Sequence, residues 1–278
     1  PCISDRVWIS PDTMARVRVD RLLVERGVSP SREKARRLVL AGEVLVDEVP
    51  VEKPGDLVDP ESRLRLRGPP SPFVGRGGEK LAGALATFGL DITGLRVLDV
   101  GASTGGFTDC LLQRGAAEVT ALDVGKGQLD WKLRSHPRVR VVEGVNARYL
   151  QAKDFPERFD LVTIDASFIS LAKLLPALVP LIREGGVLLA LVKPQFELSR
   201  KEVERGGVVR DPAKHLKAIL SVAEAAKEQG LAIEGMSASP LPGMEGNREF
   251  FILAKPGAHR GLDKDATHRL ARKVCGLG

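Results

Sequence analysis

The sequence predicts an α/β protein with a doubly wound, mostly parallel seven-stranded sheet, preceded by a small α+β domain. Three observations carry this prediction. Apolar, β-branched segments alternate with helical segments after residue 95, which is typical of a parallel sheet with helices on both faces. A glycine-rich turn directly follows the first of these strands. A proline-rich stretch, 68–72, separates this region from an N-terminal block that has helices and short strands of its own.

The N-terminal block is expected to form a domain over 14–67. A first helix, 19–26, stops at Gly27, and a second begins at Ser29-Pro30-Ser31, where serine caps the helix and proline takes an early position. The second helix ends at Gly42. Short strands are predicted at 44–46 and 64–67. We expect 1–13 to be an extension outside the fold, 68–74 to be a linker that its prolines stiffen, and 75–278 to form the second domain.

Basic residues are concentrated on the second helix of this block. Arg32, Lys34, Arg36 and Arg37 stand against a single acid, Glu33. This arrangement can face the phosphates of a nucleic acid, although a solvated helix face would carry the same charges. The whole chain has a formal net charge of +6, which favours a polyanionic partner only moderately.

The second domain is predicted from a series of alternating segments. In chain order they are strand 95–100, helix 105–114, strand 118–123, strand 139–143, strand 159–164, helix 170–183, strand 186–192, helix 212–229, strand 231–238 and strand 249–254. Asp211-Pro212 is a clear helix start, because Asp can cap the helix and Pro suits its first position. The last strand follows a loop without an intervening helix, which predicts an antiparallel final hairpin.

The turn after the first strand is the candidate ligand loop. Its sequence, Gly101-Ala102-Ser103-Thr104-Gly105-Gly106, lacks the second glycine of a dinucleotide fingerprint and the Lys-Ser/Thr pair of a phosphate loop. The next strand ends at Asp123, which can accept hydrogen bonds from a ribose. A nucleoside ligand without a pyrophosphate is therefore favoured, and S-adenosylmethionine fits. Glycine turns without a ligand also occur in α/β proteins.

Four ionisable residues are expected at one edge of the sheet. Asp165 and Lys193 end apolar strands, Glu249 begins the predicted antiparallel strand, and Lys80 follows a glycine pair at a helix start. Two lysines and two carboxylates suit the attack of an alcohol on an electrophilic methyl group. A lysine acts as a base only when it is neutral, whereas nearby carboxylates favour its charged form, and the sequence leaves this balance open. Each residue taken singly could instead be part of an ordinary salt bridge.

Composition narrows the class of protein. Cys2, Cys110 and Cys275 are too far apart for a disulfide framework or a metal site, so we predict a reducing, cytoplasmic location and no metal. No apolar run approaches the ~18 residues of a transmembrane helix, so we predict no membrane partner. The oligomeric state does not follow from the sequence.

Several segments resemble known families. Asp20-Arg21-Leu22-Leu23, Ser31-Arg32-Glu33-Lys34-Ala35 and Gly42-Glu43-Val44-Leu45-Val46 resemble the S4 RNA-binding domain. Lys80, Asp165, Lys193 and Glu249 match the Lys-Asp-Lys-Glu tetrad of the FtsJ/RrmJ-like ribose 2′-O-methyltransferases, and 101–109 looks like their S-adenosylmethionine loop. Segments 75–81, 165–171 and 192–197 match as well. From Met14 onward the chain resembles the TlyA family of ribosomal RNA methyltransferases, also called hemolysin A-like.

The resemblance implies a Rossmann-like class I methyltransferase fold and S-adenosylmethionine-dependent methylation of a ribose 2′-hydroxyl, of cytidine, in ribosomal RNA. It implies that Lys193 is the base or the hydroxyl orienter, positioned by Lys80, Asp165 and Glu249. The residues that it assigns to the cofactor are Gly101, Ala102, Ser103, Thr104, Gly105, Gly106, Phe107, Asp123, Val124, Asn146 and Asp165.

Ribosomal RNA or a ribosomal subunit is the expected partner. The residues assigned to RNA binding are Arg21, Arg32, Lys34, Arg36, Arg37, Arg76, Phe168, Phe196 and Lys201. Phe168 and Phe196 flank the predicted centre, where they would either stack on an extruded base or pack in the core. Two other functions stay open: an inactive S4 protein that assists ribosome assembly, and a membrane-active hemolysin. The complete tetrad argues against the first, and the lack of a long apolar or cationic amphipathic helix argues against the second.

Overall fold

The computed structural model describes residues 16–278 apart from 41, 68–70, 244–245 and 258–260. The chain divides into two compact units, Pro1–Pro70 and Ser71–Gly278, and each contains a hydrophobic core of its own. The extension predicted over 1–13 lies outside the described residues.

The first unit is a small α+β fold. Its elements are β1 (Val17–Arg18), α1 (Val19–Glu25), α2 (Arg32–Leu40), β2 (Val44–Val46), β3 (Val49–Pro50), β4 (Leu57–Val58) and β5 (Leu64–Leu66). β2 pairs antiparallel with β3 and β5, and β1 pairs antiparallel with β4. Val19 and Leu23 of α1 and Val39 of α2 are fully buried against Val44 and Val46 of β2. The apolar stripes of both helices thus cover the small sheet and build this core.

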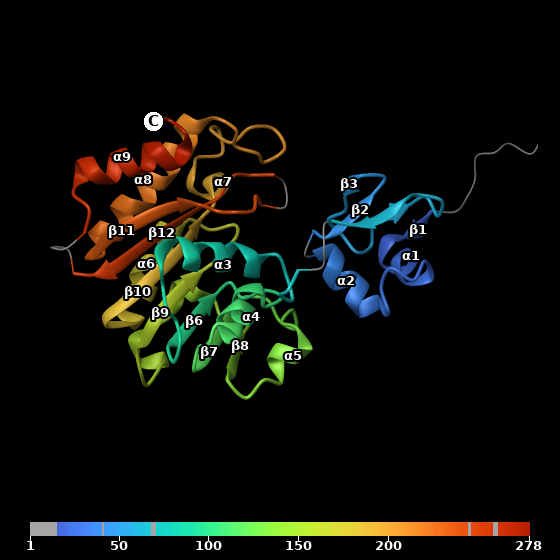
Figure 1. Ribbon diagram of the computed structural model, residues 1–278, viewed down its shortest axis with the longest axis horizontal. Coiled ribbons are helices and arrows are strands. Elements are labelled where there is room, and N and C mark those ends of the chain that lie inside the picture. Colours follow the sequence, from blue (N-terminus) through green and yellow to red (C-terminus); the bar gives the residue numbers. More distant parts are fainter. Residues whose placement is uncertain (1–15, 41, 68–70, 244–245, 258–260) are drawn as a thin grey trace, which may run out of the picture. The chain divides into compact units, whose positions relative to one another are not determined.

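The second unit is built on a seven-stranded sheet (Figure 1). Its strands are β6 (Arg96–Val100), β7 (Glu118–Asp123), β8 (Val139–Glu143), β9 (Phe159–Ile164), β10 (Ile182–Val192), β11 (Leu231–Ala238) and β12 (Phe250–Pro256). Their order across the sheet is β11-β12-β10-β9-β6-β7-β8. β12 runs antiparallel to both β10 and β11, whereas the other neighbouring strands of this sheet are parallel, which confirms both the mostly parallel sheet and the antiparallel final hairpin.

Helices cover both faces of this sheet. The α-helices are α3 (Gly77–Phe88), α4 (Gly106–Gln113), α5 (Trp131–Arg134), α6 (Leu175–Leu178), α7 (Pro194–Glu197), α8 (Pro212–Glu228) and α9 (Lys264–Cys275). Residues of α3 and α4 join one buried cluster with the sheet, whereas α6, α8 and α9 contribute to the other. This two-sided burial explains why the parallel strands are apolar along most of their length.

The helix predicted over 170–183 is wrong. The chain forms three short pieces, a 3₁₀ turn at Leu171–Lys173, α6, and a second 3₁₀ turn at Val179–Leu181. Pro176 and Pro180 each stand near the start of a new piece. Proline has no backbone N–H and clashes with the preceding turn, so a continuous helix cannot form here. In addition, α9 was not predicted, although Asp263 caps it by accepting a hydrogen bond from Ala266 N at 2.7 Å.

Candidate active site and RNA-binding surface

Four ionisable side chains meet at the edge of the sheet where β9 and β10 end and β12 begins. Asp165 follows β9, Lys193 follows β10 and Glu249 precedes β12. Because β12 is antiparallel, its start lies at the same edge as the ends of β9 and β10. Lys80, in the first turn of α3, completes the group. The structure thus brings together all four residues that the sequence places at one edge.

The four side chains form two ion pairs. Lys80 Nζ donates a hydrogen bond of 2.6 Å to Glu249 Oε2. Lys193 Nζ lies 2.6 Å from Asp165 Oδ1 and donates a hydrogen bond of 2.9 Å to Ser167 Oγ. Lys80 and Lys193 are each 9% exposed and Glu249 is 3% exposed. Water therefore screens these charges only weakly, and they interact strongly with one another.

Neighbouring charges set the protonation of the Lys193–Asp165 pair. Burial favours a neutral Lys193, but the carboxylates of Asp165 and Glu249 outweigh burial and raise the pKa of Lys193. Burial also opposes the charge on Asp165, yet the ammonium groups of Lys193 and Lys80 lower the pKa of Asp165. The Lys80–Glu249 pair therefore supports the charges of the Lys193–Asp165 pair. In this arrangement Lys193 is an ammonium group rather than a free base.

The glycine loop, residues 101–106, joins β6 to α4 beside this site. Gly101 has φ 84° and Gly105 has φ 99°, both in the left-handed region. A Cβ on Gly101 would lie 2.6 Å from the carbonyl oxygen of Asp165, and one on Gly106 would lie 2.9 Å from the backbone N of Gly78. Glycine is thus needed at both positions because the loop packs tightly on Asp165 and on the start of α3. Part of the glycine pattern therefore reflects packing within the protein.

Asp123 ends β7 and Val124 follows it, next to the glycine loop. The Asp123 carboxylate accepts hydrogen bonds from the backbone N–H groups of Ser103 at 2.8 Å and Gly125 at 2.7 Å. The Val124 side chain is 69% exposed. A carboxylate and an exposed apolar side chain at adjacent positions suit a ligand that carries both hydroxyl groups and an apolar ring.

Other residues assigned to a cofactor serve the fold as well. The Phe107 side chain is 3% exposed and stacks on Phe251, with ring centroids 6.3 Å apart, so only its backbone could reach a ligand. Ala102 is 6% exposed. Asn146 Oδ1 accepts a hydrogen bond of 3.0 Å from Arg148 N and caps a 3₁₀ turn.

A buried acid outside the predicted set of site residues lies beneath the loop. Asp99 of β6 is fully buried and accepts hydrogen bonds from Thr108 Oγ1 at 2.7 Å and Thr163 Oγ1 at 3.1 Å. Burial raises the pKa of Asp99 to about 7. These bonds tie β6 to α4 and β9, the elements that carry the glycine loop and Asp165. An acid within an apolar strand is the signal that could have identified it.

Two aromatic side chains lie on the loops that carry the ion pairs. Phe168 is 91% exposed and has a left-handed backbone with φ 64°. Its ring centroid lies 5.1 Å from that of Phe196 in α7. Core packing, one of the two alternatives that the sequence allows, therefore does not describe Phe168.

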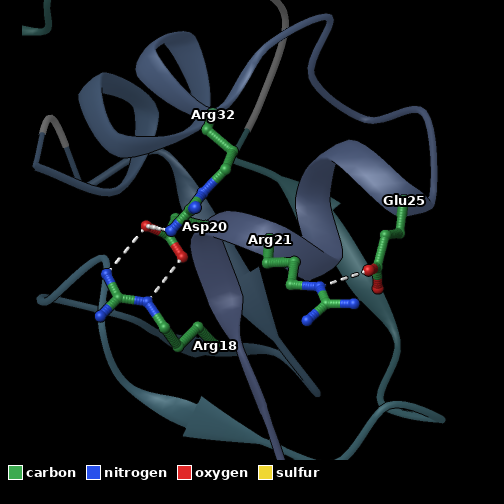
Figure 2. Close-up of polar contacts among 5 residues, drawn as sticks. All are labelled: Arg18, Asp20, Arg21, Glu25 and Arg32. Carbon is green, nitrogen blue, oxygen red and sulfur yellow. Dashed lines mark hydrogen bonds and ion pairs between the residues drawn. The ribbon is translucent and has the colours of Figure 1, made fainter.

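A shared carboxylate organises the basic surface of the first unit. Asp20 is fully buried and accepts hydrogen bonds from Arg18 Nε at 3.1 Å and Arg18 Nη2 at 2.9 Å. Arg32 Nη2 of α2 donates to the same carboxylate at 3.4 Å, and Figure 2 shows the two guanidinium groups converging on it. The side chains of Arg18 and Arg32 nevertheless remain 48% and 61% exposed. Asp20 thus holds two cations at the surface, one of which, Arg18, the sequence did not predict.

The remaining predicted RNA-binding residues are spread over both units. Arg21 Nε donates a hydrogen bond of 2.6 Å to the exposed Glu25 (Figure 2). Lys34 and Arg36 are exposed on α2, and Arg37 forms an ion pair with Glu33. In the second unit, Arg76 donates to the carbonyl of Pro242 at 3.4 Å, and Lys201 is exposed.

Within the described residues, no group of three or more His, Cys, Asp or Glu side chains is placed to hold a metal ion. The helices of the same part of the chain are all too short or too polar to span a membrane.

The family models identify an S4 domain that is followed along the chain by a methyltransferase domain. Residues 73–255 match the family model of the FtsJ-like methyltransferases, and residues 17–64 match that of the S4 domain. The chain is 47% identical to the 16S/23S rRNA (cytidine-2′-O)-methyltransferase TlyA of Mycobacterium tuberculosis over 259 residues, which are 91% of this chain and 97% of that protein. This chain belongs to the TlyA family of FtsJ-like methyltransferases.

Relatives named as hemolysins share the same architecture. Hemolysin A of Brachyspira hyodysenteriae is 36% identical over 84% of this chain and 98% of its own length. The solved structure of a hemolysin-named protein from Streptococcus thermophilus is 39% identical and has a TM-score of 0.73, covering 95% of this chain and 98% of that one. The names methyltransferase and hemolysin thus both occur among proteins that align with this chain over most of its length.

Proposed function

We propose that this protein transfers a methyl group from S-adenosylmethionine to the 2′-hydroxyl of a ribose in ribosomal RNA, with cytidine as the target nucleoside. The observation that carries the proposal is the pairing of Lys80 with Glu249 and of Lys193 with Asp165 directly beside the glycine loop. The name of the Mycobacterium tuberculosis relative supports the reaction and the substrate.

The residues around the glycine loop fit this cofactor. Asp123 can accept hydrogen bonds from the ribose hydroxyls, and the exposed side chain of Val124 offers an apolar contact for the adenine ring. The first turn of α4 presents backbone N–H groups that have no partner within the helix. When bound, S-adenosylmethionine supplies an electrophilic methyl group. Ser103, which is exposed, and Thr104, which is half-buried, would border the same ligand.

The tetrad would hold the ribose in place. Lys193, kept as an ammonium by Asp165 and Glu249, donates a hydrogen bond to the ribose oxygen and fixes its direction. Lys80 pairs with Glu249 and so fixes the position of the Glu249 carboxylate. In this role Lys193 is an orienting group, and the hydroxyl proton would pass to water as the oxygen takes the methyl group and S-adenosylhomocysteine is left. A large part of the rate would come from in-line placement of the hydroxyl group and the methyl group.

Both units would contribute to RNA binding. The paired guanidinium groups of Arg18 and Arg32 suit phosphate oxygens, since Arg presents several donors in a fixed plane. Phe168 offers an exposed ring at the proposed centre, and Phe196 packs against this ring. An extruded base would stack on Phe168. The cytoplasm, where ribosomes are made, is the matching location.

The test is transfer of tritiated methyl groups to ribosomal RNA, followed by mapping of alkali-resistant ribose positions. We expect the wild-type chain to methylate rRNA and Lys193→Ala to lose about 100-fold in kcat, the effect of a misplaced reacting group, while it still binds S-adenosylmethionine. Lys173→Ala, which removes an exposed lysine, is the matched control. Full activity of Lys193→Ala would refute the role assigned to Lys193. Cofactor binding without transfer to any rRNA would instead support an inactive assembly protein.

A further inference from the structure

Two segments at the candidate centre are joined at three successive points. The β9 loop, residues 165–171, and the segment after β10, which is Lys193 followed by α7, each begin with a member of the tetrad. Lys193 contacts Asp165 and Ser167 at the first point, and the rings of Phe196 and Phe168 meet at the second. The third point is Glu197, whose carboxylate reaches back to the end of the β9 loop.

Glu197 uses both carboxylate oxygens in this contact. Oε2 accepts a hydrogen bond of 2.6 Å from Ser170 Oγ, and Oε1 accepts one of 2.9 Å from Leu171 N. No ion pair of Glu197 occurs within the described part of the chain, and burial raises the pKa of its carboxyl group. A partly buried carboxylate without a cation depends on such hydrogen bonds for its stability. The contact therefore fixes the end of the β9 loop firmly.

Phe168 lies between the first and third points and has an unfavourable conformation. Its left-handed backbone is uncommon for a bulky residue, and its ring is 91% exposed although it is apolar. Such a conformation persists where the surrounding structure holds it, and it occurs often at functional sites. Here the surroundings are the Lys193 contacts on one side of Phe168 and the Glu197 contacts on the other.

We propose that Glu197 is a positioning residue, which holds the end of the β9 loop so that the exposed ring of Phe168 stacks on the base of the target nucleoside. The inference rests on the proposed RNA methyltransferase function and deepens it. Glu197 acts through Phe168 and not through the tetrad, because its hydrogen bonds end on Ser170 and Leu171, whereas Lys193 is bound to Asp165 and Ser167.

A double-mutant cycle separates this role from a general structural one. Glu197→Ala, Phe168→Ala and the double variant are compared by kcat/KM for rRNA methylation, with cofactor affinity and the thermal midpoint measured in parallel. We expect kcat/KM of each single variant to fall about 10-fold or more, which is the usual effect of losing an aromatic ring that stacks on a base. We expect the double variant to be no worse than Phe168→Ala alone, because Glu197 has nothing left to position.

Glu197→Gln is the conservative variant. Its amide oxygen can accept from Leu171 N and its amide nitrogen can donate to Ser170 Oγ, so we expect it to restore most of the activity that Glu197→Ala loses. Losses that multiply in the double variant, or an active Glu197→Ala, would overturn the inference even though the wild type methylates rRNA. A wild-type protein that does not methylate rRNA would count against the proposed function itself.

Discussion

Lys193 carries its proton because two carboxylates outweigh the cost of burying the charge. The sequence places these residues at one sheet edge through a simple rule, since the ends of parallel strands and the start of an antiparallel neighbour coincide. It could not settle the charge on Lys193, because that depends on a distance of 2.6 Å to Asp165 and on a burial that no local pattern encodes. Ser167 and Glu197 were missed for a related reason. Each is a common polar residue, and its partner becomes visible only when two loops are placed together.

Asp165→Asn is predicted to lower the pKa of Lys193. Without the adjacent carboxylate, burial becomes the larger influence and favours the neutral amine. We expect a loss of about 3–5 kcal/mol in the free energy of unfolding as well, which is typical when one member of a buried pair is removed. The pKa can be followed by NMR titration of the Lys193 side chain, with the exposed Lys173 as internal control. An unchanged Lys193 pKa would contradict the electrostatic account.

The wild-type pair also has a defined pH window. The raised pKa of Lys193 stabilises the fold below the unfolded value of about 10.4, and this contribution is lost as pH rises through the folded pKa. The lowered pKa of Asp165 stabilises the fold above about 3.9, and this contribution is lost as pH falls through the folded pKa. Between these limits both side chains are charged and the pair contributes fully.

At the scale of elements, apolar periodicity predicts strands well and helices less evenly. The strands at 118–123, 139–143, 159–164 and 231–238 were predicted at their observed bounds, because each is a short apolar run between turn residues. The apolar segment at 170–183 also has helical spacing, but its two prolines divide it. The helix α9 was not predicted, although Ala271 and Cys275 are buried and Leu270 and Val274 pack against the same apolar cluster at helical spacing.

Glycine in the loop between β6 and α4 is predicted to be needed for cofactor binding. A methyl group on Gly106 would meet the backbone N of Gly78 at 2.9 Å and push the loop away from α3. We expect Gly106→Ala to destabilise the fold by roughly 1–3 kcal/mol through overpacking and to weaken S-adenosylmethionine binding measurably by calorimetry. Gly89→Ala is the control, since Gly89 has φ 61° but open space around it. The free energy of unfolding of Gly89→Ala should fall by about 1 kcal/mol, and this variant should bind the cofactor normally.

The helix α2 is predicted to supply RNA affinity through Arg32. Arg32→Ala should raise the KM for rRNA and reduce the slope of log KM against log salt by about 0.7–0.9, the effect of one lost phosphate contact. Arg65→Ala removes the same charge from β5, where Arg65 pairs with Glu48, and should have a smaller effect. Equal effects of the two variants would show that only net charge matters and that the guanidinium pair of Arg18 and Arg32 on Asp20 has no special role.

At the scale of the whole molecule, the guanidinium pair proposed to bind phosphates and the tetrad proposed to position the ribose lie in different units. The S4 unit carries the Asp20-bound guanidinium pair, and the second unit carries the tetrad and the glycine loop. The predicted linker, 68–74, belongs in part to the second unit. Val74 N donates to Asp109 Oδ2 at 2.8 Å, and Gln113 Nε2 of α4 donates to the carbonyl of Pro72 at 3.1 Å. A proline-rich stretch indicates an extended segment, but it does not reveal what that segment contacts.

A fragment of residues 71–278 is predicted to bind S-adenosylmethionine as tightly as the full chain and to bind rRNA more weakly. The second unit has its own buried clusters, and starting at residue 71 keeps the bonds of Pro72 and Val74 to α4. The fragment should have a higher KM for rRNA, and this KM should depend less steeply on salt, because the phosphate contacts of the S4 unit are absent. The full chain with Arg18→Ala and Arg32→Ala is the control, and it should shift in the same direction by a smaller amount. A fragment whose KM and salt slope equal those of the full chain would mean that the S4 unit does not bind the substrate, and the division of labour between the units would have to be abandoned.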